Sequence, residues 1–339
     1  MSSYAAHENA LKNAMELKEH GDIEGALEEL HLTLHGKKFR GNNIILERVI
    51  IEMIDLCGDN LITTYLKEDI GHFRNVCQHT NMTLLENVLK KLKDRADDAI
   101  KRCEEENGFD KLKQLLGGAN SEEDADTQAV SAFLSGDQAE LNPEELMLLA
   151  NCNFEQVESK QSLMNKVAFF IDVCKIILDT LRQNSKMIDF YNQTAQRVFD
   201  FCSKYNYRVE YVRVAETLHS HFNQIIKISK HPELSVQSKI PFPIRLDEED
   251  ALQKVLELRY HQLKLSLELK IWSDAFRTTE NIYQLINRQK HHASRMKQIL
   301  SDFFQNLSEI FWQSEFYLFH AYAIMNLQQI IKFNKTLTD

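Results

Sequence analysis

The sequence predicts an all-α protein, an irregular tetratricopeptide-like solenoid of helical pairs wound into a right-handed superhelical array. Three observations predict this fold class. Apolar residues recur at gaps of three and four, which places them on one face of an α-helix. All ten glycines lie at or before Gly136, and the last 203 residues (339 − 136) show no convincing strand alternation. A small residue followed by a large one recurs on the second helix of several pairs. The match is loose, so a non-repeating helical bundle remains the alternative.

The repeated spacing is clearest in IWSDAFRTTENIYQLI, residues 271–286. The same gaps of three, one and three occur in Ile23, Ala26, Leu27 and Leu30, in Trp272, Ala275, Phe276 and Thr279, and in Leu318, Ala321, Tyr322 and Met325. A small residue at such a position lets a neighbouring helix approach closely. We therefore expect the following residues to pack between paired helices: Ala26, Leu27, Trp272, Ala275, Phe276, Trp312 and Ala321.

Taken in order, the periodic segments predict helices over residues 6–20, 23–35, 43–57, 59–80, 82–107, 109–117, 143–151, 160–183, 185–205, 207–230, 247–270, 272–289 and 292–333, the last broken near Gln313. One helix start is well marked. In NPEEL, Asn142 can cap the helix, Pro143 can take its first position, and Glu145 can complete a capping box. The proline-bearing stretch HPELSVQSKIPFPIRLDEED is interpreted as a loop, with a new helix starting near Asp247.

A polar and acidic segment interrupts the helical pattern at residues 117–142. It contains GGANSEEDADT and SGDQAELN, a composition typical of an exposed linker. The sequence therefore predicts an N-terminal helical array over 1–116, the acidic linker, and a C-terminal helical array over 143–339.

The composition limits the classes of protein to which this chain can belong. Apolar residues make up 43% and charged residues 27%, a balance with ample material for a core. The net charge of −10 argues against a surface that clamps nucleic acid throughout, although a local basic patch stays possible. No run of 18 apolar residues is present, so we expect no membrane span. The six cysteines lack CxxC pairing and mostly follow apolar stripes, which favours buried thiols in a reducing, cytoplasmic compartment.

The sequence carries no evident catalytic constellation. Motifs for phosphate loops, dinucleotide binding, nucleophile elbows and HExxH metal sites are missing. His291 and His292 are adjacent and would point about 100° apart on a helix, which does not suit one metal ion. The acidic cluster from Asp247 to Asp250 more simply complements the positive end of a helix dipole. We therefore predict no catalytic residue, no metal and no cofactor, and a scaffold rather than an enzyme.

One basic element stands apart in GKKFRGNN, residues 36–43. Lys37, Lys38 and Arg40 surround Phe39 in a loop bounded by glycines. The loop could contact an acidic partner or RNA, with Phe39 as an apolar anchor. The alternative is a soluble loop whose Phe39 folds back onto the core.

The start of the chain, HENALKNAMELKEHGDIEGALEELHLTLHGKKFR, resembles the N-terminus of the family of the largest subunit of eukaryotic translation initiation factor 3. The matching features are Glu8 to Lys12, the turn at Gly21, Ala26 and Leu27, and the basic segment Lys37 to Arg40. Later stretches agree in order and extend the resemblance over about residues 7 to 333. They include Asn81 to Glu86, Leu181 to Ser185, Phe199 to Cys202, Trp272 to Phe276, and Phe311 to Ala321.

The resemblance implies a non-catalytic scaffold that acts in the cytoplasm. It implies binding to other initiation factor 3 subunits and to proteins and rRNA of the small ribosomal subunit during pre-initiation complex assembly, with mRNA as a further candidate. Lys37, Lys38 and Arg40 match the family's basic segment and would be a contact with rRNA or a ribosomal protein. Family members continue into a PCI domain, so we expect this chain to be a fragment that lacks the downstream PCI domain.

Two other functions stay open at the level of sequence. One is a PCI-type scaffold subunit of the proteasome lid or signalosome, which shares helical arrays. The other is a tetratricopeptide-like adaptor that binds peptide tails, although no repeated carboxylate clamp is evident.

Overall fold

The computed structural model describes residues 3–36, 43–77, 81–118, 154–231, 242–288 and 293–335. In these residues every regular element is a helix, twelve α-helices and one short 3₁₀ helix, and none is a strand. The predicted all-α class is therefore confirmed. The chain divides into two compact units, Met1–Arg182 and Gln183–Asp339.

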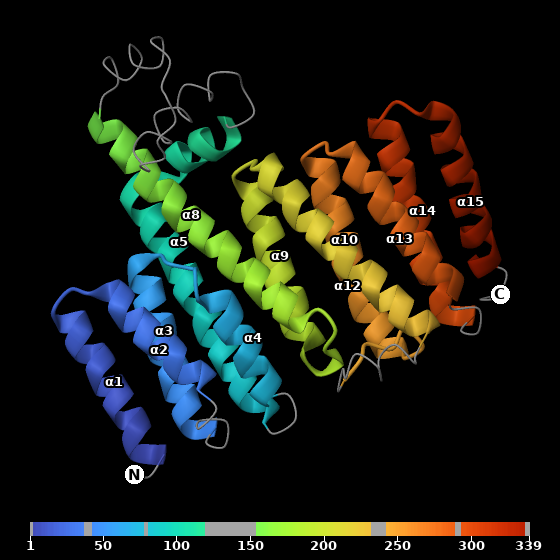
Figure 1. Cartoon of the computed structure of the whole chain (residues 1–339). Coiled ribbons are helices and arrows are strands. Elements are labelled where there is room, and N and C mark those ends of the chain that lie inside the picture. Colours follow the sequence, from blue (N-terminus) through green and yellow to red (C-terminus); the bar gives the residue numbers. More distant parts are fainter. Residues whose placement is uncertain are drawn as a thin grey trace. The chain divides into compact units, whose positions relative to one another are not determined.

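The described residues of the first unit form six α-helices that pack on one another (Figure 1). They are α1 (Ser3–Glu19), α2 (Ile23–His35), α3 (Asn43–Asn60), α4 (Leu66–Cys77), α5 (Met82–Gly118) and α8 (Phe154–Leu181). Helix α1 packs on α2 and α2 packs on α3, while α3 also packs on α5, and α5 packs on α8. Helix α4 contacts α2, α3, α5 and α8, and so ties the unit together.

In its described residues, the second unit consists of one short 3₁₀ helix and six α-helices (Figure 1). It contains η2 (Ser185–Met187), α9 (Ile188–Lys204), α10 (Arg208–Lys230), α12 (Glu249–Glu268), α13 (Trp272–Arg288), α14 (Ala293–Gln313) and α15 (Tyr317–Lys335). Helix α9 packs on α10 and α12, α12 packs on α13, and α13 packs on α14. The last contact, between α14 and α15, is extensive. One apolar core runs from Ile188 to Ile310 through these helices.

A shared turn joins the two helices of a pair at five places. A backbone N–H bonds to the carbonyl five residues before it, and the residue just before the donor takes a left-handed conformation, with φ between 54° and 83°. These left-handed residues are Gly21, Leu61, Asn206, Lys270 and Glu315. The pattern is the Schellman motif, which satisfies carbonyls at a helix C-terminus. The motif ends α1, α3, α9, α12 and α14, so the helical-pair arrangement is present in both units.

Several helix boundaries differ from those predicted from the sequence. Helices predicted over 82–107 and 109–117 form one helix, α5, which continues through Gly108. The helix predicted over 59–80 starts only at Leu66, because Leu61 turns the chain. The break predicted near Gln313 is confirmed by the end of α14. The helix predicted over 143–151 lies outside the described residues.

The boundary between the two compact units lies later in the chain than the segment predicted to separate the two arrays. Helices α5 and α8 stand on either side of residues 119–153 and pack on each other, so they belong to one unit. The units divide between Arg182 and Gln183. Beyond Gly118, residues of the predicted linker 117–142 lie outside the described part of the chain, and their linker character stays a prediction.

Candidate functional site

Helix α15 exposes an apolar face that the described residues do not cover. The exposed large apolar side chains are Trp312 and Phe316, which precede the helix, and Tyr317, Leu318, Phe319, Tyr322, Met325 and Ile331 on it. We call these eight residues the aromatic face. Leu318 is 80% exposed and Trp312 is 59% exposed. Isolated apolar residues on a surface are normal, whereas a contiguous group of this kind marks an interaction site.

The rings of the aromatic face contact each other. Trp312 lies 5.7 Å from the ring of Tyr317 and 5.1 Å from that of His320, measured between centroids. Phe319 lies 5.4 Å from Phe311. The His320 ring is fixed in turn, because its Nδ1 lies 2.8 Å from the Ser308 carbonyl oxygen of α14. These contacts limit the rotamers that the rings can adopt, which lowers the entropy lost on binding a partner.

The residues predicted to pack between helices lie in different environments. Ala26 and Leu27 on α2 and Ala275 on α13 are buried. Trp272 is partly buried against the core of the second unit. Phe276 is 36% exposed and contacts the ring of Phe311 at 6.2 Å.

Trp312 and Ala321 are both exposed, although the Trp312 ring on α14 contacts the rings of Tyr317 and His320 on α15. On α15 it is Ala323 that is fully buried. Leu318, Ala321, Tyr322 and Met325 all carry the predicted spacing and all face outward. The spacing that marks a buried face on α2 therefore marks an uncovered face on α15.

A buried polar network joins three helices of the second unit. Arg259 on α12 donates from Nη1 to Oε1 of Gln262 at 2.7 Å and from Nη2 to the Leu218 carbonyl on α10 at 2.8 Å. Gln262 donates from Nε2 to both carboxylate oxygens of Asp274 on α13, at 3.1 and 3.0 Å. The Tyr211 hydroxyl donates to the Gln262 carbonyl at 2.8 Å. Burial raises the pKa of Asp274, although Gln262 and Arg259 oppose the rise. Each polar side chain serves to fix another, so the network is structural.

A second cluster lies in the first unit and was missed in the sequence. Asp69 on α4 is fully buried, and its Oδ1 lies 2.8 Å from Nδ1 of His31 and 3.0 Å from Nε2 of His35, both on α2. Burial raises the pKa of Asp69, while the two histidines oppose the rise. Two histidines four residues apart on a helix were a signal available in HLTLH, whereas the distant Asp69 was not.

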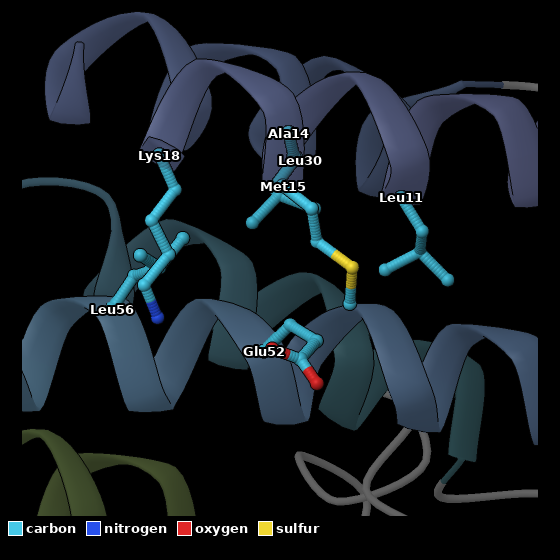
Figure 2. Close-up of a pocket in the computed structure, with 7 residues that line it drawn as sticks. All are labelled: Leu11, Ala14, Met15, Lys18, Leu30, Glu52 and Leu56. Atoms are coloured by element: carbon cyan, nitrogen blue, oxygen red, sulfur yellow. The ribbon is translucent and has the colours of Figure 1, made fainter. Parts of the chain in front are cut away.

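The first unit also has a shallow depression between α1, α2 and α3 (Figure 2). Its volume is about 220 Å³ including open solvent, below the range of about 300–1,000 Å³ that is usual for small-molecule pockets. The lining is Leu11, Ala14, Met15, Lys18, Leu30, Glu52 and Leu56. Figure 2 shows Met15 and Lys18 extending from α1 toward α3. We assign no ligand to it.

The other candidate residues named from the sequence either lie outside the described residues or occupy ordinary helix positions. Lys37, Lys38, Phe39 and Arg40 lie outside the described residues, as do His291 and His292. Glu249 and Asp250 occupy the first turn of α12, where carboxylates complement the helix dipole. No helix among the described residues is long and apolar enough to cross a membrane.

Comparison with known proteins places the whole chain in one group. The family model described as "eIF3a, PCI domain, TPR-like region" matches residues 8–339. In Arabidopsis thaliana, the eIF3a protein of eukaryotic translation initiation factor 3 is 30% identical over 100% of this chain and 32% of its own length. The eIF3a proteins of Nicotiana tabacum and Aspergillus terreus are 29% and 30% identical, over 100% and 93% of this chain and 33% and 29% of their own lengths. The chain thus spans about a third of the curated relatives that it matches.

Among solved structures, the chain resembles a circular tandem repeat protein with novel repeat topology and enhanced subunit contact surfaces. The TM-score is 0.32 at 13% identity, over 97% of this chain and 76% of the other, and this likeness carries no argument. The family model supports the expected tetratricopeptide-like array, since its own description names a TPR-like region. The chain belongs to the eIF3a family, and it matches the region that this family's model describes as TPR-like.

Proposed function

We propose that this chain is a non-catalytic scaffold region of an eIF3a protein of translation initiation factor 3. In this role it binds other subunits of the factor and helps to dock the complex on the small ribosomal subunit during pre-initiation complex assembly. The family match supports this function over a proteasome-lid or signalosome scaffold and over a peptide-binding adaptor. The structural observation that carries the proposal is the aromatic face on α15.

The aromatic face suits a protein partner with a complementary helical surface. Aromatic residues and methionine are enriched at protein interfaces, and the residues that dominate binding energy are mostly Trp, Tyr and Arg. Trp312, Tyr317 and Tyr322 are each more than half exposed. The face also repeats the spacing that α2 uses to pack on its neighbours, so a helix of another protein of the complex could pack on it in the same manner.

Contact with rRNA is proposed for the basic segment of Lys37, Lys38 and Arg40. The net charge of −10 disfavours nucleic-acid binding over the whole surface, which leaves a local basic segment as the element suited to phosphates. Phe39 would stack on a base or enter an apolar pocket. This part of the proposal rests on the sequence and on the family resemblance.

The test is capture of initiation factor 3 subunits from a cell lysate by the tagged chain. Leu318→Glu combined with Tyr322→Glu places two charges on the aromatic face and should remove the captured subunits. The matched control adds two negative charges elsewhere on the second unit, Gln193→Glu with Asn223→Asp, at exposed positions on α9 and α10. The control should capture as the parent does. Equal capture by all three chains would show that the aromatic face is not the binding surface.

The basic segment has its own test. Replacing Lys37, Lys38 and Arg40 by Glu should leave the melting temperature nearly unchanged, because surface substitutions usually change stability within about 0.5 kcal/mol. Co-sedimentation with purified small ribosomal subunits should weaken and should lose part of its salt dependence. Unaltered co-sedimentation would rule out the basic segment as the ribosome contact.

A further inference from the structure

We propose that His31, His35 and Asp69 form a binding site for a divalent transition metal ion of the Zn²⁺ class, which fastens α2 to α4. One atom from each residue converges, and the three atoms lie within 4.8 Å of one another. The proposal is independent of the proposed function, since it concerns a different unit from the aromatic face.

The two distances from Asp69 Oδ1 are near those of a tetrahedral site, and the two histidine nitrogens lie within 4.8 Å of each other. Bonds of about 2.0–2.1 Å to Zn²⁺ place tetrahedral ligand atoms about 3.3–3.4 Å apart. Asp69 Oδ1 now lies 2.8 Å from His31 Nδ1 and 3.0 Å from His35 Nε2, so each pair needs to separate by only about half an ångström. The two histidines stand four residues apart on α2, the helical spacing that brings two imidazoles to one metal ion.

The chemistry of the three ligands selects the class of metal. Imidazole nitrogens with one carboxylate suit Zn²⁺ and neighbouring transition metals, whereas Ca²⁺ and Mg²⁺ prefer sets made of oxygen alone. The side chain of His35 is 37% exposed and that of His31 is 19% exposed, while Asp69 is closed to solvent. A metal ion therefore has access from the histidine side, where water can complete the coordination.

Asp69 is a poorly satisfied residue without such an ion. Its Oδ1 carries both histidine contacts, whereas its Oδ2 is buried and has no hydrogen-bond partner among the described residues. A buried carboxylate oxygen left without a partner costs free energy, and such groups in a native fold call for an explanation. A metal ion held by Asp69 would supply the missing positive charge.

The surrounding rings are arranged to orient the two imidazoles. The His31 ring lies 4.9 Å from that of Tyr65, and the His35 ring lies 4.7 Å from that of His72, between centroids. Burial, and after it the charge of the nearby Asp69, raises the pKa of the Cys57 thiol to about 12, and the Cys57 sulfur is not among the three atoms that converge.

When Asp69 is ionised it only accepts, and the tautomers that pair with it carry their protons on Nδ1 of His31 and Nε2 of His35. From these tautomers, metal binding requires a change of tautomer rather than loss of a proton from the protein. On binding, these two nitrogens give their lone pairs to the metal, and each proton moves through solvent to the other ring nitrogen. The carboxylate binds as an anion, so Zn²⁺, the carboxylate and the two neutral imidazoles together carry a net charge of +1.

The experiment uses the whole chain stripped of metal by a chelator and titrated with Zn²⁺ in a calorimeter. Substituting Co²⁺ then gives a visible absorption band that reports tetrahedral nitrogen and oxygen ligands. The variant is His31→Gln with His35→Gln, because a glutamine amide still donates a hydrogen bond to Asp69 and is a poor metal ligand. The matched control is His261→Gln, which removes a histidine that pairs with Asp200 at the surface of the other unit.

We expect one Zn²⁺ per chain, with an increase in melting temperature on binding, and the same for the His261 control. The double variant should fold, as judged by circular dichroism, and should bind at least about 10–100-fold more weakly. Its melting temperature should no longer respond to Zn²⁺. Equal Zn²⁺ affinity in the parent and the double variant, or no binding by either, would overturn the proposal and leave a hydrogen-bonded cluster.

Discussion

Gln262 links two buried charged side chains, so its loss should lower the stability of the second unit. Its amide stands between a buried cation and a buried anion, accepting from Arg259 at 2.7 Å and donating to Asp274 at 3.0 and 3.1 Å. Gln262→Leu keeps nearly the same volume and removes both hydrogen-bonding ends. The change therefore tests the polar network rather than the packing.

The size of the expected loss of stability follows from the interactions that Arg259 and Asp274 would keep in Gln262→Leu. Arg259 is 3% exposed and would keep one bond, to the Leu218 carbonyl, and its position 4.8 Å from the ring centroid of Phe222. Its Nε already has no partner. Among the described residues, Asp274 would keep one hydrogen-bond contact, with the Tyr211 hydroxyl at 3.4 Å. A hydrogen bond to a charged group contributes about 1.5–3 kcal/mol, and breaking a buried pair costs about 3–5 kcal/mol. We expect a loss of about 3–5 kcal/mol in the free energy of unfolding of this unit.

The assay is urea unfolding followed by circular dichroism, with thermal unfolding as a second measurement. The control is Gln253→Leu on the same helix, where the amide bonds only to an exposed Glu257. That control should change the stability by less than about 0.5 kcal/mol. A loss below about 1 kcal/mol for Gln262→Leu would refute the reasoning, because solvent or rearranged side chains would then be satisfying both charges.

Two further changes in α13 and its neighbours have defined outcomes. Ala275 is fully buried in the core, so Ala275→Trp should overpack the core and lower the free energy of unfolding by about 1–3 kcal/mol. The control Ser273→Trp, at an exposed position, should leave it unchanged. Equal melting curves for the two variants would argue against a close approach of helices at Ala275. Burial raises the pKa of Asp274 in the folded chain, so its contribution to stability is present at low pH and is lost as the pH rises through that raised value. Relative to Asp274→Asn, the parent should therefore become less stable as the pH increases above about 4, and a difference independent of pH would contradict the shift.

Much of the fold could be predicted because helical periodicity is a local signal. The turns at Gly21, Lys270 and near Gln313 were evident from spacing, and each ends a helix in the structure. The continuous α5 was not evident, since Gly108 disfavours a helix interior by about 1 kcal/mol and tertiary packing outweighs that preference. The packing of α8 on α5 is likewise a contact between distant segments, which composition does not reveal.

The candidate sites show the same limit more sharply. The spacing of Leu318, Ala321 and Tyr322 correctly indicates one apolar face, but a pattern cannot state whether another helix covers that face. His31 and His35 are a local signal, because residues four apart lie on the same face of a helix. A search limited to histidines one or two residues apart does not detect this pair. Its third member, Asp69, lies 38 residues from His31 in the chain and joins the cluster only through the packing of α4 on α2.

The five Schellman turns explain why the repeat is weak in sequence and regular in structure. The turn requires one left-handed residue, which costs about 1–2 kcal/mol for most residues but less for glycine and asparagine. Gly21 avoids that cost, whereas Leu61, Lys270 and Glu315, and to a smaller extent Asn206, bear it. Packing between paired helices must therefore hold these four turns, so the repeated element is a backbone geometry rather than a residue type. In such an array each added pair covers the outer face of the pair before it, and on α15 the described residues leave the aromatic face uncovered.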